Sequence, residues 1–162
     1  GCIDVVVNIM RFSSDRLDGI DKQILGMLLD DSRITLSHIS KKVGISSPAI
    51  RERMRKLEQE GIIKGFSTIV DYKKLGLGLT AFIGLSMDES KCCQEDVFIE
   101  LEKIPRVLEA HFTNGEEDIL VKVVTENTET LVDLLGQMNA IDGVNRTKTM
   151  IALKTPIERS LN

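Results

Sequence analysis

Apolar residues in the first third of the chain recur every three or four positions, a spacing typical of amphipathic helices. Three helices are predicted, beginning near Asp18, Thr35 and either Ser46 or Ser47, whose side-chain oxygens can cap a helix N-terminus. The apolar positions that would face a shared core are Ile20, Ile24, Met27, Leu28, Leu36, Ile39, Val43, Ile50, Met54 and Leu57. Gly44 stands where a helix would end in the left-handed conformation, so the second and third helices are predicted to form a helix-turn-helix.

The segment after Gly61 is predicted to be extended. Residues 62–71 read IIKGFSTIVD, which favours a strand, and Lys64-Gly65 suits a tight turn within it. Such a ribbon beside a helix-turn-helix would be the wing of a winged-helix domain. The sequence KKLGLG at residues 73–78 then predicts a linker.

The second half of the chain alternates between strand and helix periodicities. A strand is predicted over residues 79–87, with Leu79, Ala81, Ile83, Leu85 and Met87 on one face. A helix over about 92–104, a hairpin of strands 107–113 and 118–125, a helix over 128–141 and a strand over about 144–153 follow. This βαββαβ order predicts a ferredoxin-like domain, so the fold class is α+β.

Both faces of the predicted sheet carry apolar residues. Phe82 stands beside Ile83, and Val123 beside Val124, so each neighbouring pair points one apolar side chain to either face. The two helices would cover only one face, and an exposed apolar sheet face usually marks an interface. We therefore expect this half to dimerise.

The net charge of −4 conceals an uneven distribution. Residues 15–65 hold ten Lys and Arg against eight Asp and Glu, whereas residues 66–162 hold ten against sixteen. Between Lys41 and Lys56 the chain has six cationic residues opposed only by Glu52. A local basic surface of this kind suits contact with phosphate groups whatever the total charge.

Most of these cations are predicted to point away from the core. At about 100° per residue, Arg51, Arg55 and Lys56 lie opposite the stripe that contains Ile50, where a recognition helix meets the major groove. The candidate DNA contacts are Lys41, Lys42, Ser46, Ser47, Ala49, Arg51, Arg55, Lys56 and Lys64. Arg53 borders the buried stripe, so DNA contact and an ion pair that holds the helices together are both open for it.

Other function classes find little support. The chain has two histidines and none of the usual nucleophile, phosphate-loop or zinc-ligand patterns, so neither an enzyme nor a metal or other cofactor is expected. The three cysteines, Cys2, Cys92 and Cys93, fit reduced thiols in a cytoplasmic protein. No apolar run is long enough to span a membrane. A sensor or scaffold whose winged helix binds protein instead of DNA is the alternative to a DNA-binding regulator.

The order of several motifs resembles the Lrp/AsnC (feast/famine) family of transcription regulators over residues 17–155. The N-terminal motifs are Leu17-Asp18, Asp21, Ile24-Leu25, Asp31-Ser32-Arg33, Val43-Gly44-Ile45-Ser46, Arg53-Met54, Leu57-Glu58, Gly61 to Phe66 and Leu75-Gly76. The C-terminal motifs are Gly115-Glu116-Glu117-Asp118, Gly143-Val144 and Thr147-Lys148-Thr149. The end of the chain, from Thr149 to Asn162, is more similar to the AsnC branch.

The resemblance implies a homodimer that binds double-stranded DNA and often assembles as four dimers into an octamer. It also implies an amino-acid effector, bound between dimers near the loop of residues 114–118. The candidate effector contacts are Asn114, Gly115, Glu116, Glu117, Asp118, Thr147 and Thr149. Backbone N–H groups near Gly115 would take the effector carboxylate and Glu117 or Asp118 its ammonium. The alternatives are an ordinary hairpin turn and an effector-independent protein that organises DNA.

These predictions divide the chain into five parts. Residues 1–14 are an N-terminal extension of unknown role, residues 15–65 a winged helix-turn-helix, and residues 66–78 a strand and linker. Residues 79–155 form the oligomerisation and amino-acid-sensing domain, and residues 156–162 form a tail.

Overall fold

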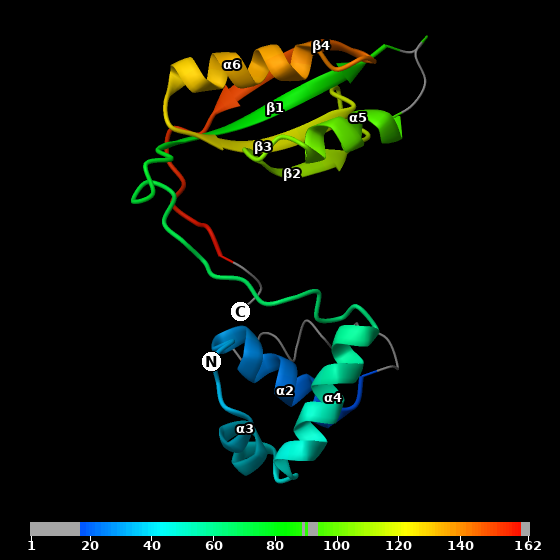
Figure 1. Ribbon diagram of the computed structural model, residues 1–162, viewed down its shortest axis with the longest axis vertical. Helices are drawn as coiled ribbons and strands as arrows, with labels where there is room; N and C mark the ends of the chain where they lie inside the picture. The colour runs from blue at the N-terminus through cyan, green and yellow to red at the C-terminus, as the bar shows by residue number, and fades with distance from the viewer. Residues whose placement is uncertain (1–16, 89, 91–93, 160–162) are drawn as a thin grey trace. The chain divides into compact units, whose positions relative to one another are not determined.

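The computed structural model describes residues 17–88, 90 and 94–159 (Figure 1). The predicted N-terminal extension, Cys2, Cys92 and Cys93 lie outside the described residues. The chain divides into two compact units between Thr68 and Ile69, and again between Pro156 and Ile157. Each unit is considered by itself below.

The first unit contains the three predicted helices, α2 (Gly19–Asp30), α3 (Leu36–Val43) and α4 (Ser47–Gln59). Asp18 caps α2 in a capping box with Asp21, and the side chains of Thr35 and Ser46 cap α3 and α4. Gly44 ends α3 with a φ of 81°, a left-handed conformation that glycine adopts without a steric penalty. The predicted caps and turn therefore form as expected, and Ser46, not Ser47, is the cap of α4.

A small apolar core holds these helices together. Ile24, Ile39 and Ile50, one from each helix, are fully buried against one another, and Leu28 completes the cluster. Partly buried residues surround it, namely Ile20, Met27, Ile34, Leu36, Val43, Ile45, Met54 and Ile63. Burial of this stripe leaves the opposite side of α4 facing solvent.

The predicted strand over residues 62–71 does not form. These residues have no regular secondary structure, and Ile62, Phe66, Ile69 and Val70 are exposed. A strand is stable only when its backbone N–H and C=O groups pair with another strand. All strand pairs in the described chain lie within the sheet of the second unit, so this segment lacks a partner and the prediction of a strand here was wrong.

The second unit has the predicted βαββαβ order. Its elements are β1 (Leu79–Met87), α5 (Gln94–Glu102), β2 (Val107–Phe112), β3 (Ile119–Thr125), α6 (Thr128–Asn139) and β4 (Val144–Ile151). The four strands form one antiparallel sheet in the order β2-β3-β1-β4. This is the ferredoxin-like arrangement, and the predicted α+β class is confirmed.

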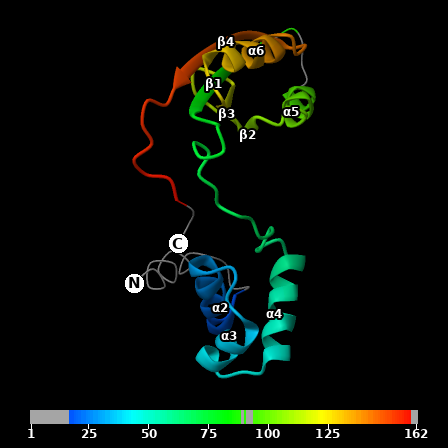
Figure 2. The same ribbon diagram turned by 60° about the vertical axis from the view of Figure 1, so that its left-hand side comes forward.

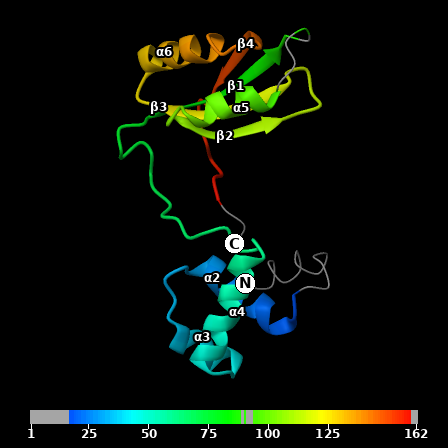
Figure 3. The ribbon, with the colours of Figure 1, turned by 45° about the vertical axis from the view of Figure 1, so that its right-hand side comes forward.

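The helices α5 and α6 pack on the same face of this sheet (Figures 2 and 3). The inward side chains of β1 and β3 alternate along each strand, as the buried residues Ala81, Ile83 and Leu85 on β1 show. They contact Val97 and Leu101 of α5 and further buried residues of α6. The other face of the sheet has no helix on it among the described residues.

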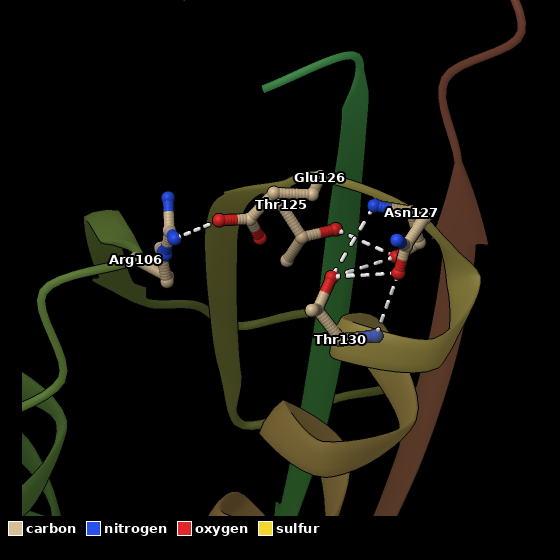
Figure 4. A network of polar contacts seen from close by, with 5 residues as sticks. All are labelled: Arg106, Thr125, Glu126, Asn127 and Thr130. Carbon is tan, nitrogen blue, oxygen red and sulfur yellow. Dashed lines mark hydrogen bonds and ion pairs between the residues drawn. The ribbon is translucent and has the colours of Figure 1, made fainter. Parts of the chain in front are cut away.

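A polar network fixes the start of α6 (Figure 4). The Asn127 side chain accepts the Thr130 N–H at 3.0 Å, and Thr130 Oγ1 accepts the Asn127 N–H at 3.2 Å, which forms a capping box. Beside it, Arg106 forms an ion pair with Glu126. The ends of β2 and β3 are thereby joined next to the N-terminus of α6.

Candidate nucleic-acid interface and effector loop

The solvent-facing side of α4 is basic. Its buried stripe contains Ile50 and Leu57, and Arg51, Arg55 and Lys56 are exposed on the other side. Near the helix start, Ser46 is exposed and Ser47 and Ala49 are half-buried; Lys41, Lys42 and Lys64 outside α4 are exposed. The Ser46 hydroxyl accepts the Ala49 N–H at 3.3 Å, so this side chain caps the helix.

Ion pairs divide these cations into two groups. Within the described residues, Lys41, Lys42, Arg51, Lys56 and Lys64 take part in no ion pair. Arg55 instead donates from Nε and Nη2 to the two carboxylate oxygens of Glu52, at 2.9 and 2.6 Å. Hydrogen bonding from Arg55 lowers the pKa of Glu52, so this carboxylate is charged at neutral pH.

Arg53 is part of the scaffold. Its Nη1 lies 2.6 Å from Asp18 Oδ2 and 2.8 Å from Asp21 Oδ1, which ties α4 to the N-terminus of α2. The pKa of Asp18 is lowered by the Asp21 N–H and by Arg53, and the two carboxylates raise the pKa of Arg53. Of the two roles that the sequence leaves open for Arg53, the structure shows the ion pair.

The loop between β2 and β3 is tied by its own hydrogen bonds. Thr113 Oγ1 donates to the Glu117 carbonyl at 2.6 Å and accepts the Gly115 N–H at 3.1 Å. Asp118 Oδ2 accepts the Met87 N–H at 2.7 Å. The Gly115 N–H and one Asp118 oxygen, both candidates for holding an effector, therefore have partners within the chain.

Glu117 lies over the helix-free face of the sheet. Its Oε2 accepts a hydrogen bond from Ser86 Oγ at 2.5 Å, whereas its buried Oε1 has no hydrogen-bond donor among the described residues. The nearest cation is Arg146, whose Nη2 is 3.8 Å from Oε1. Next to this pair, Lys148 Nζ lies 3.8 Å from the Oε2 of the exposed Glu116. Each of the two loop carboxylates, Glu117 and Glu116, thus lies 3.8 Å from one cation of β4.

The strand register separates the two predicted threonines from Glu117. Thr147 pairs with Leu85 and Thr149 with Ile83, so both point to the helix side of the sheet, and Thr147 Oγ1 accepts from Asn139 at 3.3 Å. The structure does not bring them to the Glu117 side chain within one chain.

Arg146 and Lys148, which sequence reasoning missed, are the β4 residues beside the loop. They pair with Ser86 and Gly84, and therefore share the face on which Glu117 lies. The two-residue alternation of β4 was the signal that could have identified them.

Two negative findings bear on the class of site. In residues 17–88, 90 and 94–159, no group of three or more His, Cys, Asp or Glu side chains is placed to hold a metal ion. None of the described helices is both long enough and apolar enough to cross a membrane.

Comparisons with known proteins agree with this arrangement. Residues 17–64 match the winged helix-turn-helix DNA-binding family, and residues 80–161 match the Lrp/AsnC ligand binding domain family. The HTH-type transcriptional regulator FL11 of Pyrococcus horikoshii is 40% identical over 139 residues, which cover 86% of this chain and 91% of FL11.

Solved structures show the same similarity. Escherichia coli AsnC superposes with a TM-score of 0.81 at 32% identity, covering 89% of this chain and 97% of that one. A feast or famine regulatory protein from Mycobacterium tuberculosis, solved in complex with L-methionine, has a TM-score of 0.82 at 30% identity, covering 88% and 95%. The chain therefore belongs to the Lrp/AsnC family of transcription regulators and combines their helix-turn-helix DNA-binding domain with their ligand-binding domain.

Proposed function

We propose that this regulator binds its operator as a homodimer through the outward face of α4, and that an amino acid bound at the loop of residues 113–118 modulates this binding. The observation that carries the proposal is the set of exposed cations on and beside α4 that form no ion pair within the described residues, because a recognition helix contacts DNA through its solvent-facing side. A protein with this role is expected in the compartment that holds the DNA, the cytoplasm of a prokaryotic cell, and no catalytic activity is proposed for it.

The DNA interface contains two kinds of contact. Arg51 and Lys56, exposed on α4, form no ion pair within the described residues and can reach base edges or phosphate oxygens. Lys41, Lys42 and Lys64 supply further phosphate contacts from outside that helix. Ser47 and Ala49 are small, which allows the N-terminal turn of α4 to approach the groove closely, and the remaining hydroxyl capacity of Ser46 suits a phosphate.

An amino acid matches the charges around the effector loop. A zwitterion offers an ammonium, which suits the carboxylates of Glu116 and Glu117, and a carboxylate, which Arg146 and Lys148 can bind. The complex of the M. tuberculosis relative with L-methionine supports an effector of this class. Exposed Asn114 and Glu116 lie at the entrance of the loop, where they would contact the effector side chain. Thr147 and Thr149 face away from Glu117, so they would contact an effector only from a second subunit.

Dimerisation through the helix-free sheet face follows from its residues. Phe82 pairs with Met150, and both project from this face, with Leu120 beside Gly84 on the next strand. The Met150 side chain is 56% exposed, so pairing two such faces would bury apolar surface that water now contacts. A dimer presents two copies of α4 to two half-sites, and four dimers would form the octamer that the family resemblance implies.

Two experiments test the proposal. In a gel-shift assay with salt titration, the combined substitutions R51A, R55A and K56A should weaken binding strongly and reduce its salt dependence, because phosphate contacts make affinity fall steeply with salt. Unchanged binding would rule out α4 as the DNA contact.

In a thermal-shift screen of the twenty amino acids, at least one of them should raise the melting temperature of the protein. No shift with any amino acid would favour an effector-independent regulator.

A further inference from the structure

The exposed face of α4 has a carboxylate at its centre. At about 100° per residue around the helix axis, Glu52 lies about 200° from the buried Ile50, with Arg51 and Arg55 on one side and Lys56 on the other. Its side chain is 52% exposed, and that of Arg55 is 51% exposed. Glu52 is the one acidic residue between Lys41 and Lys56. Any DNA that meets these cations therefore also meets Glu52.

A carboxylate at this place weakens binding to most DNA sequences. It repels the phosphates of every duplex, and it loses water on entering the groove. Only a base that donates a hydrogen bond into the major groove compensates for these costs, and the typical partner of a Glu side chain is the N4 amino group of cytosine. A residue that binds one base and is penalised at the others creates specificity by exclusion.

Arg55 and Glu52 have complementary hydrogen-bonding groups for guanine and cytosine. A guanidinium has five N–H donors, and Arg55 uses two of them on the Glu52 carboxylate at 2.9 and 2.6 Å. The remaining donors can reach the O6 and N7 acceptors of guanine, while each Glu52 oxygen retains a lone pair for cytosine N4. The bidentate geometry also holds Arg55 on the helix surface and away from phosphate oxygens in general.

We propose that Glu52 is a specificity-determining residue of this regulator, which selects cytosine in the operator while Arg55, held by the same carboxylate, binds guanine. The proposal rests on the proposed contact of α4 with DNA. Without this role, Glu52 would only form an exposed i,i+3 ion pair with Arg55.

The test uses the full-length protein and a pool of duplexes with a randomised core. Sequences retained by the wild type, E52Q and E52A are compared, with E58A as the matched control because Glu58 is another exposed carboxylate on α4. E52Q should change the preferred base at one position of each half-site from cytosine to adenine, since glutamine pairs with adenine N6 and N7. E58A should retain the wild-type sequence.

E52A gives a second, quantitative readout. The ratio of affinity for the selected sequence to affinity for random duplex should fall about tenfold, as expected on loss of one good base contact. Affinity for random duplex should rise, because Arg55 becomes available to phosphate. The slope of the logarithm of the binding constant against the logarithm of the salt concentration should then become steeper by about one, which corresponds to one more released counterion. Exposed ion pairs add little to folding stability, so these variants should melt near the wild-type temperature.

The outcomes separate this inference from the function on which it rests. If E52Q and E52A select the wild-type sequence with an unchanged affinity ratio, while R51A weakens DNA binding, Glu52 has no role in discrimination and the inference is wrong. If R51A and K56A also leave DNA binding unchanged, then α4 does not contact DNA, and both proposals fail.

Discussion

Glu117 occupies the space that a side chain at Gly84 would need. A Cβ built on Gly84 would lie 2.6 Å from Glu117 Cγ and 3.0 Å from Glu117 Cβ, both closer than van der Waals contact allows. The clash involves the base of the Glu117 side chain, so turning the carboxylate alone would not relieve it. Because Gly84 has no side chain, the Glu117 carboxylate can lie on the sheet and accept a hydrogen bond from Ser86.

We expect G84A to displace Glu117. The new methyl group should break the bond between Ser86 and Glu117 and lower the free energy of unfolding by about 1–3 kcal/mol, as overpacking usually does. It should also reduce the thermal shift produced by the effector. Urea unfolding followed by circular dichroism measures the first effect. E117A in the same chain should recover most of the lost stability; if it does not, the clash lies elsewhere.

The different surroundings of Arg53 and Arg51 predict opposite phenotypes. R53A leaves Asp18 and Asp21 without their shared cation and should destabilise the first unit by about 1 kcal/mol, with little direct effect on DNA contacts. R51A should leave the melting temperature unchanged and weaken DNA binding at every salt concentration tested. Thermal denaturation and gel shifts on the same preparations distinguish them. A stable R53A variant that no longer binds DNA would contradict this division.

The cap of α2 should make the first unit sensitive to acid. The folded-state pKa of Asp18 lies below its ordinary value of 3.8, chiefly because its carboxylate accepts the Asp21 N–H and then because of Arg53. A carboxyl group with a lowered folded pKa stabilises the fold fully above its unfolded pKa and loses that contribution as pH falls through the folded value. The melting temperature of the protein should therefore decrease as the pH is lowered below about 4. In D18N, which retains a cap acceptor, this part of the pH dependence should be absent.

The start of α6 offers a test confined to the second unit. N127A removes the acceptor for the Thr130 N–H at 3.0 Å and should cost about 1 kcal/mol, the usual value of an N-cap side chain. E129A, an exposed first-turn substitution on the same helix, is the control and should cost less. Chemical unfolding of both variants gives the comparison, and equal losses would mean that the capping box contributes nothing specific.

Local sequence signals were sufficient for most of the fold because they act over a few residues. The caps at Asp18, Thr35 and Ser46 and the turn at Gly44 satisfy backbone groups of their own helices, and the alternation of β1 places its residues correctly without knowledge of the partner strands. The segment at 62–71 has the composition of a strand, but pairing is a property of two segments, and composition alone does not supply the second.

The side-chain contacts of the candidate sites were less accessible from the sequence. The pairing of Arg53 with Asp18 spans 35 positions, and the helical wheel left its role open. The placement of Arg146 and Lys148 beside Glu117 depends on the register between β1 and β4 and on the absence of a side chain at Gly84. Register follows from the fold as a whole, whereas the family resemblance groups Thr147 and Thr149 with the loop on sequence alone.

A charged residue on the helix-free face of the sheet should dissociate the proposed dimer. M150D places a charge on that face beside Phe82, and a charge buried without a partner in an apolar interface is strongly unfavourable. Size-exclusion chromatography with light scattering should show monomers for M150D at concentrations where the wild type is dimeric. The matched control is V132D on α6, where Val132 is 66% exposed and points away from the core, and this variant should remain dimeric.

Because one α4 contacts only one half-site, M150D should also bind operator DNA more weakly although α4 is unchanged. Dimers that persist in M150D but dissociate in V132D would place the interface on the helices instead.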